Sequence, residues 1–210
     1  VRITDKPHDQ SFIEHYVNVG QGSGQALLTA MDTFAGRSNH AELRTVPFLL
    51  WGMSAGGEFN YEFVAWKPER VLAFVVNKGG IYYTALASQA ARNVPGILFI
   101  GGKDLDSRIH TITGLFDLNR RAGALWALAE EPNAAHVVGR SIDVAKMLYE
   151  DVLNLGNVFP QNGFIADIKA KTFQPAATAP KGTEGTAWLP TERVARAWQA
   201  MVTEKPFDPR

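Results

Sequence analysis

The feature that most constrains this chain is the alternation of short apolar runs with stretches of helical periodicity. The apolar runs lie at residues 46–51, 71–76, 97–100 and 124–127, and turn-forming residues flank them. Apolar runs of this length without polar alternation are typical of strands that are buried on both faces, as parallel strands are. The alternation therefore predicts an α/β fold, in which a mostly parallel sheet is flanked by helices.

Amphipathic stretches connect the expected strands and extend beyond them at both ends. Upstream of the first buried strand, the pattern predicts a strand over residues 12–19. A helix is expected to follow the glycine-rich segment 20–24 and to end at Gly36. The other helices are expected over residues 57–66, 82–91, 109–121, 142–153 and 192–202.

The composition of the chain changes after Phe159. Residues 174–187 are rich in proline, alanine, threonine and glycine, which is typical of an irregular surface loop. A length of 210 residues suits one domain with a substantial core. We therefore expect a single domain over residues 1–210, in which residues 160–210 form an extension packed on the rest.

Charge and composition argue against several classes of partner. Lysine plus arginine and aspartate plus glutamate each number 21, so no net field attracts nucleic acid or an anionic membrane. No apolar stretch approaches the roughly 20 residues that span a bilayer. The absence of cysteine excludes disulfides, thiolate metal sites and a cysteine nucleophile. No metal-ligand spacing stands out, and we expect neither a metal nor a cofactor.

Residues 52–56, Gly-Met-Ser-Ala-Gly, match the pattern G-x-S-x-G at the end of an expected buried strand. In a sharp strand-to-helix turn of this kind, the serine is held in a strained backbone and its hydroxyl is exposed above the sheet. We expect that the turn leaves no room for side chains at Gly52 and Gly56. Ser54 is the candidate nucleophile, and the backbone N–H of Ala55 is the candidate oxyanion donor. The alternative is a non-catalytic turn in which Ser54 is an ordinary helix cap.

A serine hydroxyl is a weak nucleophile at neutral pH, so it needs a base, which in turn needs an orienting acid. In this type of site the acid and the histidine lie in loops after later strands, in that order. His136 is the candidate base because it lies in the loop after the fourth expected strand. Asp104 is the candidate acid, since it follows the strand at 97–100 more closely than its rival Asp106 does.

Other titratable residues fit these roles less well. Three histidines precede the serine, which is the wrong order: His8, His15 and His40. His110 lies inside an expected helix, where a solvated or core histidine is the simpler interpretation. Glu130 and Glu131 are expected to be solvated or to border the substrate site.

Three motifs carry a resemblance to a known family. They are the elbow Trp51-Gly-Met-Ser-Ala-Gly-Gly57, the loop Gly-Gly-Lys-Asp104, and Gly123-Ala-Leu-Trp-Ala-Leu with His136 beyond it. Together they resemble the α/β-hydrolase esterases, in particular the dienelactone-hydrolase-like and polyhydroxybutyrate-depolymerase-like groups, over roughly residues 27–153. The resemblance implies attack of Ser54 on an ester carbonyl, an acyl-enzyme, and hydrolysis by water activated at His136. Dienelactone hydrolases proper carry a cysteine nucleophile, so the serine points to ester rather than lactone chemistry.

The chain departs from this family upstream of the elbow. A complete fold of the family has about eight strands, and a loop after the third supplies the second oxyanion N–H. Segment 20–24 is the only candidate for that loop, but it opens a helix too close to Ser54. A parallel sheet with one bare edge and an uncovered face should not be a soluble monomer. We therefore expect the N-terminal strands of the fold to be missing from this chain and to belong to an absent segment or a second chain.

The expected substrate is a small-molecule ester. The same triad also serves serine peptidases and thioesterases, because the nucleophile does not disclose the leaving group. A non-catalytic binding protein on a hydrolase scaffold is an alternative of a different class. The tail Trp188-Leu-Pro-Thr-Glu-Arg193 is similar to the C-terminal ends of secreted relatives, which slightly favours a secreted or periplasmic protein.

Overall fold

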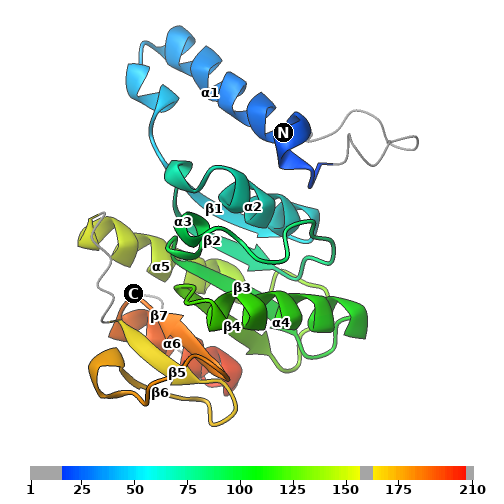
Figure 1. Cartoon of the computed structure of the whole chain (residues 1–210), viewed down its shortest axis with the longest axis vertical. Coiled ribbons are helices and arrows are strands. Elements are labelled where there is room, and N and C mark those ends of the chain that lie inside the picture. The colour runs from blue at the N-terminus through cyan, green and yellow to red at the C-terminus, as the bar shows by residue number, and fades with distance from the viewer. Residues whose placement is uncertain (1–15, 157–162, 207–210) are drawn as a thin grey trace.

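Four parallel strands form the central sheet of the protein. The computed structural model describes residues 16–156 and 163–206. The four strands lie side by side in their order along the chain (Figure 1): β1 (Phe48–Met53), β2 (Val71–Asn77), β3 (Gly96–Gly101) and β4 (Trp126–Glu131). Every neighbouring pair is parallel, as the alternation of strands and helices predicts.

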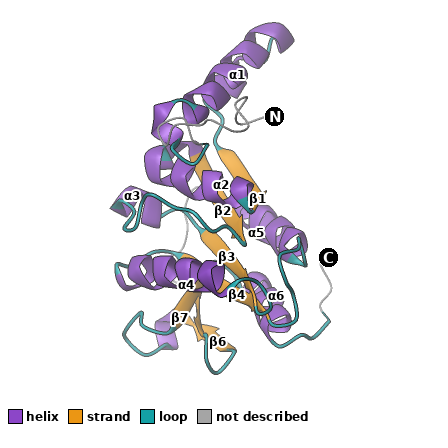
Figure 2. Cartoon of the chain, turned by 90° about the vertical axis from the view of Figure 1, so that its right-hand side faces the viewer, coloured by secondary structure: helices purple, strands orange, loops and turns teal. Residues whose placement is uncertain are grey.

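Helices flank this sheet, and the protein is therefore α/β. On one side, α2 (Ala55–Trp66) packs on β1 and β2, and α4 (Asp106–Arg121) packs on β3 and β4. On the other side, α5 (Ser141–Leu155) and α6 (Glu192–Val202) contact each other and the sheet (Figure 2). The short α3 (Gln89–Arg92) precedes β3, and α1 (Ser23–Ser38) lies beyond β1, with its first turn beside Trp66 of α2 (Figure 1).

A small antiparallel sheet follows α5. It contains β5 (Phe164–Asp167), β6 (Thr172–Pro175) and β7 (Thr186–Leu189) in the order β6-β5-β7, and β7 lies against β4. The expectation of an irregular loop over residues 174–187 is therefore wrong at both of its ends. Short 3-10 helices occupy Val19–Gln21, Ala41–Arg44, Pro68–Arg70 and Ala176–Thr178.

An aromatic cluster fills the core between α2 and the sheet. The Trp126 ring packs edge-on against Phe74 with 5.4 Å between ring centroids, and against Tyr61 with 5.8 Å. All three side chains are buried, and Trp126 donates a hydrogen bond to the Val94 carbonyl at 3.0 Å. These contacts join the helix after the serine to β2 and β4, so the elbow rests on a close-packed layer.

Most of the predicted elements are present. The helices expected at 57–66, 109–121, 142–153 and 192–202 correspond to α2, α4, α5 and α6, and the four strands are confirmed. β4 is displaced from the expected 124–127, because it begins at Trp126 and continues to Glu131. The expected helix after segment 20–24 is α1, but it runs past Gly36 and ends at Ser38, where the C-cap residue Asn39 adopts the left-handed conformation at φ 58°.

The helix predicted over residues 82–91 is wrong except for its last turn in α3. Carboxylates from α2 instead accept hydrogen bonds from backbone N–H groups just before this range and at its start. Glu58 accepts from the N–H groups of Gly80 and Ile81, and Glu62 accepts from those of Tyr83 and Thr84. These side chains hold the segment after β2 as an ordered loop, because a buried N–H needs an acceptor.

Two further expectations near the N-terminus differ from the structure. The strand at 46–51 was expected to be buried on both faces, but β1 is only partly buried and lies at the edge of the sheet that the described residues form. An apolar run predicts a strand, but not how many strands lie beside it or how fully it is covered. Of the strand expected over 12–19, residues 12–15 lie outside the described residues; residues 16–19 form a turn and the start of a 3-10 helix.

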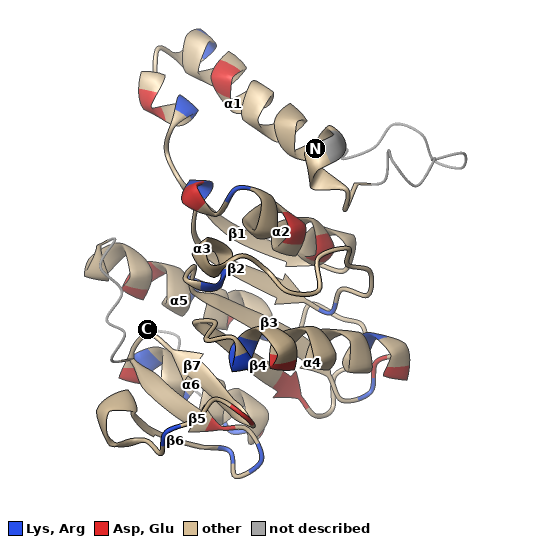
Figure 3. Cartoon of the chain, viewed as in Figure 1, with Lys and Arg blue, Asp and Glu red and all other residues tan. Residues whose placement is uncertain are grey.

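Acidic and basic positions are interspersed over the elements of the fold (Figure 3). This agrees with the equal numbers of basic and acidic residues, 21 of each. Among the helices of residues 16–156 and 163–206, none combines the length and the apolar character needed to cross a bilayer.

The packing of α6 on β4 predicts how the C-terminal segment contributes to stability. Trp198 is fully buried and donates a hydrogen bond to the Leu128 carbonyl at 2.7 Å. Trp198→Ala should lower the free energy of unfolding by about 3–5 kcal/mol. Trp198→Phe, the matched control, keeps most of the packing and should cost about 1–3 kcal/mol for the unpaired carbonyl.

Urea unfolding followed by circular dichroism measures both values. Two separate transitions in the wild type, of which Trp198→Ala shifts only one, would show instead that the C-terminal segment unfolds independently of the parallel sheet.

Candidate active site

Ser54 lies at the junction of β1 and α2 in a strained backbone conformation. Its φ is 52° and its ψ is −124°, values that a residue with a side chain rarely adopts. Its N–H donates to the Asn77 carbonyl at 2.8 Å, and its carbonyl accepts from the Glu58 N–H at 3.0 Å. The hydroxyl makes no capping hydrogen bond to α2. Strain of this kind persists where the surroundings enforce it, and it gathers at functional sites.

Close backbone approach explains the glycine before the serine but not the one after it. A Cβ on Gly52 would lie 2.3 Å from the backbone of Gly56, and one on Gly57 would lie 2.9 Å from the Gly52 carbonyl oxygen. A Cβ on Gly56 meets no atom within 4 Å. The expectation that the turn excludes a side chain at both Gly52 and Gly56 is therefore right for Gly52 and wrong for Gly56. The second crowded position is Gly57.

Asp104 and His136 come together at the end of the sheet. His136 Nδ1 lies 2.9 Å from Asp104 Oδ2, although the two residues belong to the loops after β3 and β4. The Asp104 side chain is 3% exposed, whereas that of His136 is 31% exposed and reachable from solvent. Asp104 Oδ1 accepts from the Leu105 N–H at 2.7 Å and from Arg108 Nη1 at 2.9 Å.

The surroundings of Asp104 keep it ionised at neutral pH. Burial by itself raises the pKa of this carboxyl. The hydrogen bonds from His136, Leu105 and Arg108 outweigh burial and lower the pKa below its usual value. A carboxylate at Nδ1 selects the tautomer that carries its proton there, so Nε2 of His136 is left as the basic nitrogen. The rival acid Asp106 is an exposed residue in the first turn of α4.

The parallel register brings these residues to one edge of the sheet. Met53 pairs with Asn77, Asn77 pairs with Phe99, and Gly101 pairs with Glu131, so the loops that follow the strands begin beside one another. Lys103 N–H donates to the Ala134 carbonyl at 2.9 Å, which joins the loops of Asp104 and His136. No hydrogen bond joins the Ser54 hydroxyl to His136 within the part of the chain that the structure describes. Catalytic hydrogen bonds are often loose without substrate.

Ala55 is the first residue of α2, so its N–H has no partner within the helix and points out of its N-terminus. The partial positive charge at that end favours a developing oxyanion. A second donor for the oxyanion is not identified among the described residues. His110, set aside on the sequence, is an exposed residue of α4.

The expectation that Glu131 is solvated is wrong. β4 extends to Glu131, whose buried carboxylate accepts a hydrogen bond from Lys78 Nζ at 2.6 Å. Lys78 is fully buried and has a φ of 56°. Sequence reasoning missed Lys78; the available signal was a lysine directly between a buried strand and the glycine pair 79–80. Glu130 is exposed, as expected.

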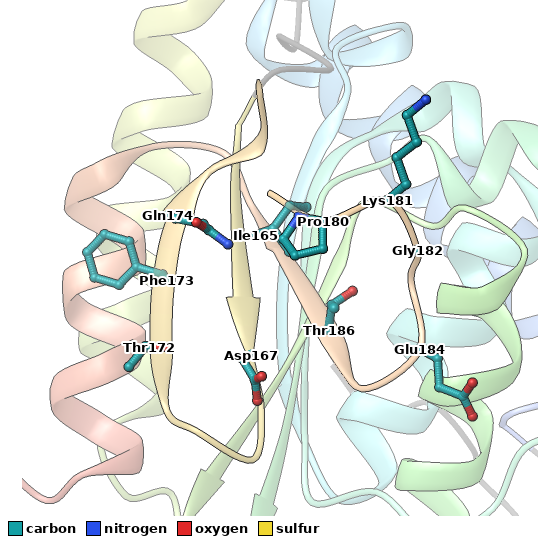
Figure 4. A pocket seen from close by; sticks show the side chains of 10 residues that line it. All are labelled: Ile165, Asp167, Thr172, Phe173, Gln174, Pro180, Lys181, Gly182, Glu184 and Thr186. Atoms are coloured by element: carbon teal, nitrogen blue, oxygen red, sulfur yellow. The ribbon is translucent and has the colours of Figure 1, made fainter. Parts of the chain in front are cut away.

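A cavity of about 400 Å³ lies away from these residues, on the small antiparallel sheet. It opens between β5, β6 and the segment before β7, and Asp167, Gln174 and Thr186 are among its lining residues (Figure 4). None of the candidate catalytic residues lines it. Over the described ranges, no group of three or more histidine, aspartate or glutamate side chains is arranged to hold a metal ion.

Comparison with known proteins does not assign the chain to a family. No protein-family model matches it, and no curated protein gives a significant match.

The glycine geometry leads to a matched pair of variants. Gly52→Ala should distort the elbow, because its Cβ would overlap the backbone of Gly56, and should lower both the unfolding midpoint and the reactivity of Ser54. Gly56→Ala should leave both close to the wild type, since its Cβ enters open space. Thermal unfolding and labelling by a serine-directed phosphonate measure the two effects. Equal damage from both substitutions would contradict the geometry.

Proposed function

We propose that this protein is a serine hydrolase of the α/β-hydrolase type that cleaves a carboxylic ester through an acyl-enzyme on Ser54. The observation that carries the proposal is the Asp104–His136 pair at the sheet edge where Ser54 adopts its strained conformation. The uncapped hydroxyl of Ser54 counts against an ordinary helix cap, the main alternative. The resemblance of the three motifs to α/β-hydrolase esterases supports the same assignment.

In the proposed reaction, Ser54 Oγ attacks the ester carbonyl carbon while His136 Nε2 takes up the hydroxyl proton. The Ala55 N–H donates to the oxyanion that forms. The intermediate breaks its carbon–oxygen bond to the alcohol, which leaves with the proton from His136. Water then gives a proton to His136 and attacks the acyl carbon. The bond between that carbon and Ser54 Oγ breaks, Oγ takes the proton back from His136, and the acid is released. Asp104 holds the Nδ1 proton and stabilises the imidazolium in both steps.

The nucleophile alone does not choose between esters, thioesters and peptides. The resemblance favours esters, and no observation favours a peptidase or a thioesterase over it. Matched ester, thioester and peptide substrates that release one fluorophore, assayed side by side, rank the three. We also propose that strands from an absent segment or a second chain complete the hydrolase fold beside β1 and supply the second oxyanion donor. The partly exposed edge of β1 supports this proposal.

Ser54→Ala and His136→Ala should each lower ester turnover by several orders of magnitude, because the nucleophile and its base act as a unit. A fluorophosphonate probe should label the wild type and not Ser54→Ala. Ser107→Ala, which changes an exposed serine of α4, is the control and should keep full labelling. Intact-mass spectrometry measures the label. A wild type that neither reacts with the probe nor turns over esters would favour the binding protein instead.

Asp104→Asn should lower kcat severely, although less than loss of Ser54 or His136, whereas Asp106→Asn should stay near the wild type. Steady-state kinetics measures the order, and a larger loss from Asp106→Asn would reverse the assignment.

Asp104 also predicts a pH dependence of stability. Because its pKa is lowered in the folded protein, its ionised form stabilises the fold above the usual carboxyl range. That contribution disappears as the pH falls through the lowered pKa, so the stability difference from Asp104→Asn should shrink in acid.

A further inference from the structure

Two buried polar residues at the end of β2 are not used by the reaction described above. Asn77 and Lys78 are both fully buried, and they follow a strand whose other side chains are mainly apolar. Lys78 shares with Ser54 the unusual feature of a positive φ at the end of a strand. Ser54 and Lys78 therefore directly follow neighbouring strands, β1 and β2.

Asn77 connects the nucleophile to the histidine loop directly. Its backbone carbonyl accepts from the Ser54 N–H at 2.8 Å. Its side-chain Nδ2 donates to the Val138 carbonyl at 2.9 Å, two residues beyond His136. Asn77 therefore contacts the backbone of Ser54 and the backbone of the loop that carries His136.

Lys78 and Glu131 make a second connection to the same loop. Lys78 Nζ donates to Asn77 Oδ1 at 3.0 Å and to Glu131 Oε2 at 2.6 Å. Glu131 Oε1 accepts from the Arg140 N–H at 2.7 Å. The loop that carries His136 is therefore held at its start by Glu131 and at its end by Val138 and Arg140.

Stability alone does not account for this arrangement. Burying an ammonium and a carboxylate has a large desolvation cost, and well-packed apolar residues are often as stable or more so. The left-handed backbone of Lys78 adds further strain. Hydrogen bonds between charged groups fix the direction of each contact, which apolar packing does not. Here these directed contacts end on the loop that carries His136.

We propose that Asn77, Lys78 and Glu131 are positioning residues, which hold the His136 loop in register with Ser54. This inference rests on the proposed serine hydrolase function. Lys78 and Glu131 act through the loop that carries His136, and Asn77 acts through that loop and through its contact with the Ser54 backbone. A displacement of about 1 Å in a catalytic group lowers turnover by roughly 100-fold, so loss of these contacts affects kcat more than KM.

The test uses Lys78→Met, which keeps a long side chain but removes the charge. We expect kcat to fall by about 100-fold with little change in KM, as for a misplaced catalytic group. Arg193→Met is the control, because it breaks ion pairs to Glu150 and Asp151, which join α5 and α6 away from the His136 loop. The control should alter stability without altering kcat. If Lys78→Met does not fold, Asn77→Ala is tested in its place, with a loss in kcat again expected.

A double-mutant cycle separates positioning from general damage. In a His136→Ala background, Lys78→Met should cause no further loss in the residual turnover, because the residue through which it acts is gone. The same fold-reduction in both backgrounds would overturn the proposal. So would a kcat close to that of the wild type in a folded Lys78→Met protein.

Amide hydrogen exchange tests the loop without catalysis. In Lys78→Met the amides of residues 137–140 should exchange faster than in the wild type and in Arg193→Met, because their anchor is lost. Unchanged exchange would overturn the positioning role even if activity fell. If Ser54→Ala kept full activity, the hydrolase proposal would fail, whereas the exchange result would still decide whether these residues hold the loop.

Discussion

The hydrogen bond from the Ser54 N–H to the Asn77 carbonyl is the contact on which the candidate site depends. It places the turn after β1 directly against the end of β2, where the backbones of Gly52, Gly56 and Gly57 approach too closely for a side chain at Gly52. The chain then enters α2 within one residue, with Ser54 at a positive φ. Without this tight junction Ser54 would be an ordinary loop residue, and Asp104 and His136 in the neighbouring loops would have no candidate nucleophile beside them.

Parallel strands supply the rest of the arrangement. Because all four strands run in one direction, the loops that follow them leave the sheet at the same edge, and residues distant in sequence become neighbours. Asp104 and His136 meet in this way across the ends of β3 and β4. Arg108 and the Leu105 N–H donate to Oδ1 of the Asp104 carboxylate, so the group is fixed with Oδ2 facing His136 Nδ1.

The same edge concentrates features that are unfavourable for stability. Ser54 and Lys78 both have strained backbones, and Lys78 and Glu131 form a buried ion pair. The aromatic core around Trp126 lies on the α2 side of the sheet and provides the close packing that such features require. This division between a well-packed layer and a strained polar edge is common where a fold supports a reactive site.

The sequence by itself determined the alternation of strands and helices, the elbow at Ser54 and the order of the candidate residues, because these depend on local periodicity and on turn chemistry. It also identified α6, whose apolar face is regular. Only the tertiary structure decided that residues 82–88 form a loop, which the Glu62 carboxylate of α2 ties down through the Tyr83 and Thr84 N–H groups. The pairing of Lys78 with Glu131 was likewise beyond the sequence, because it joins two strand ends that only the register of the sheet brings together.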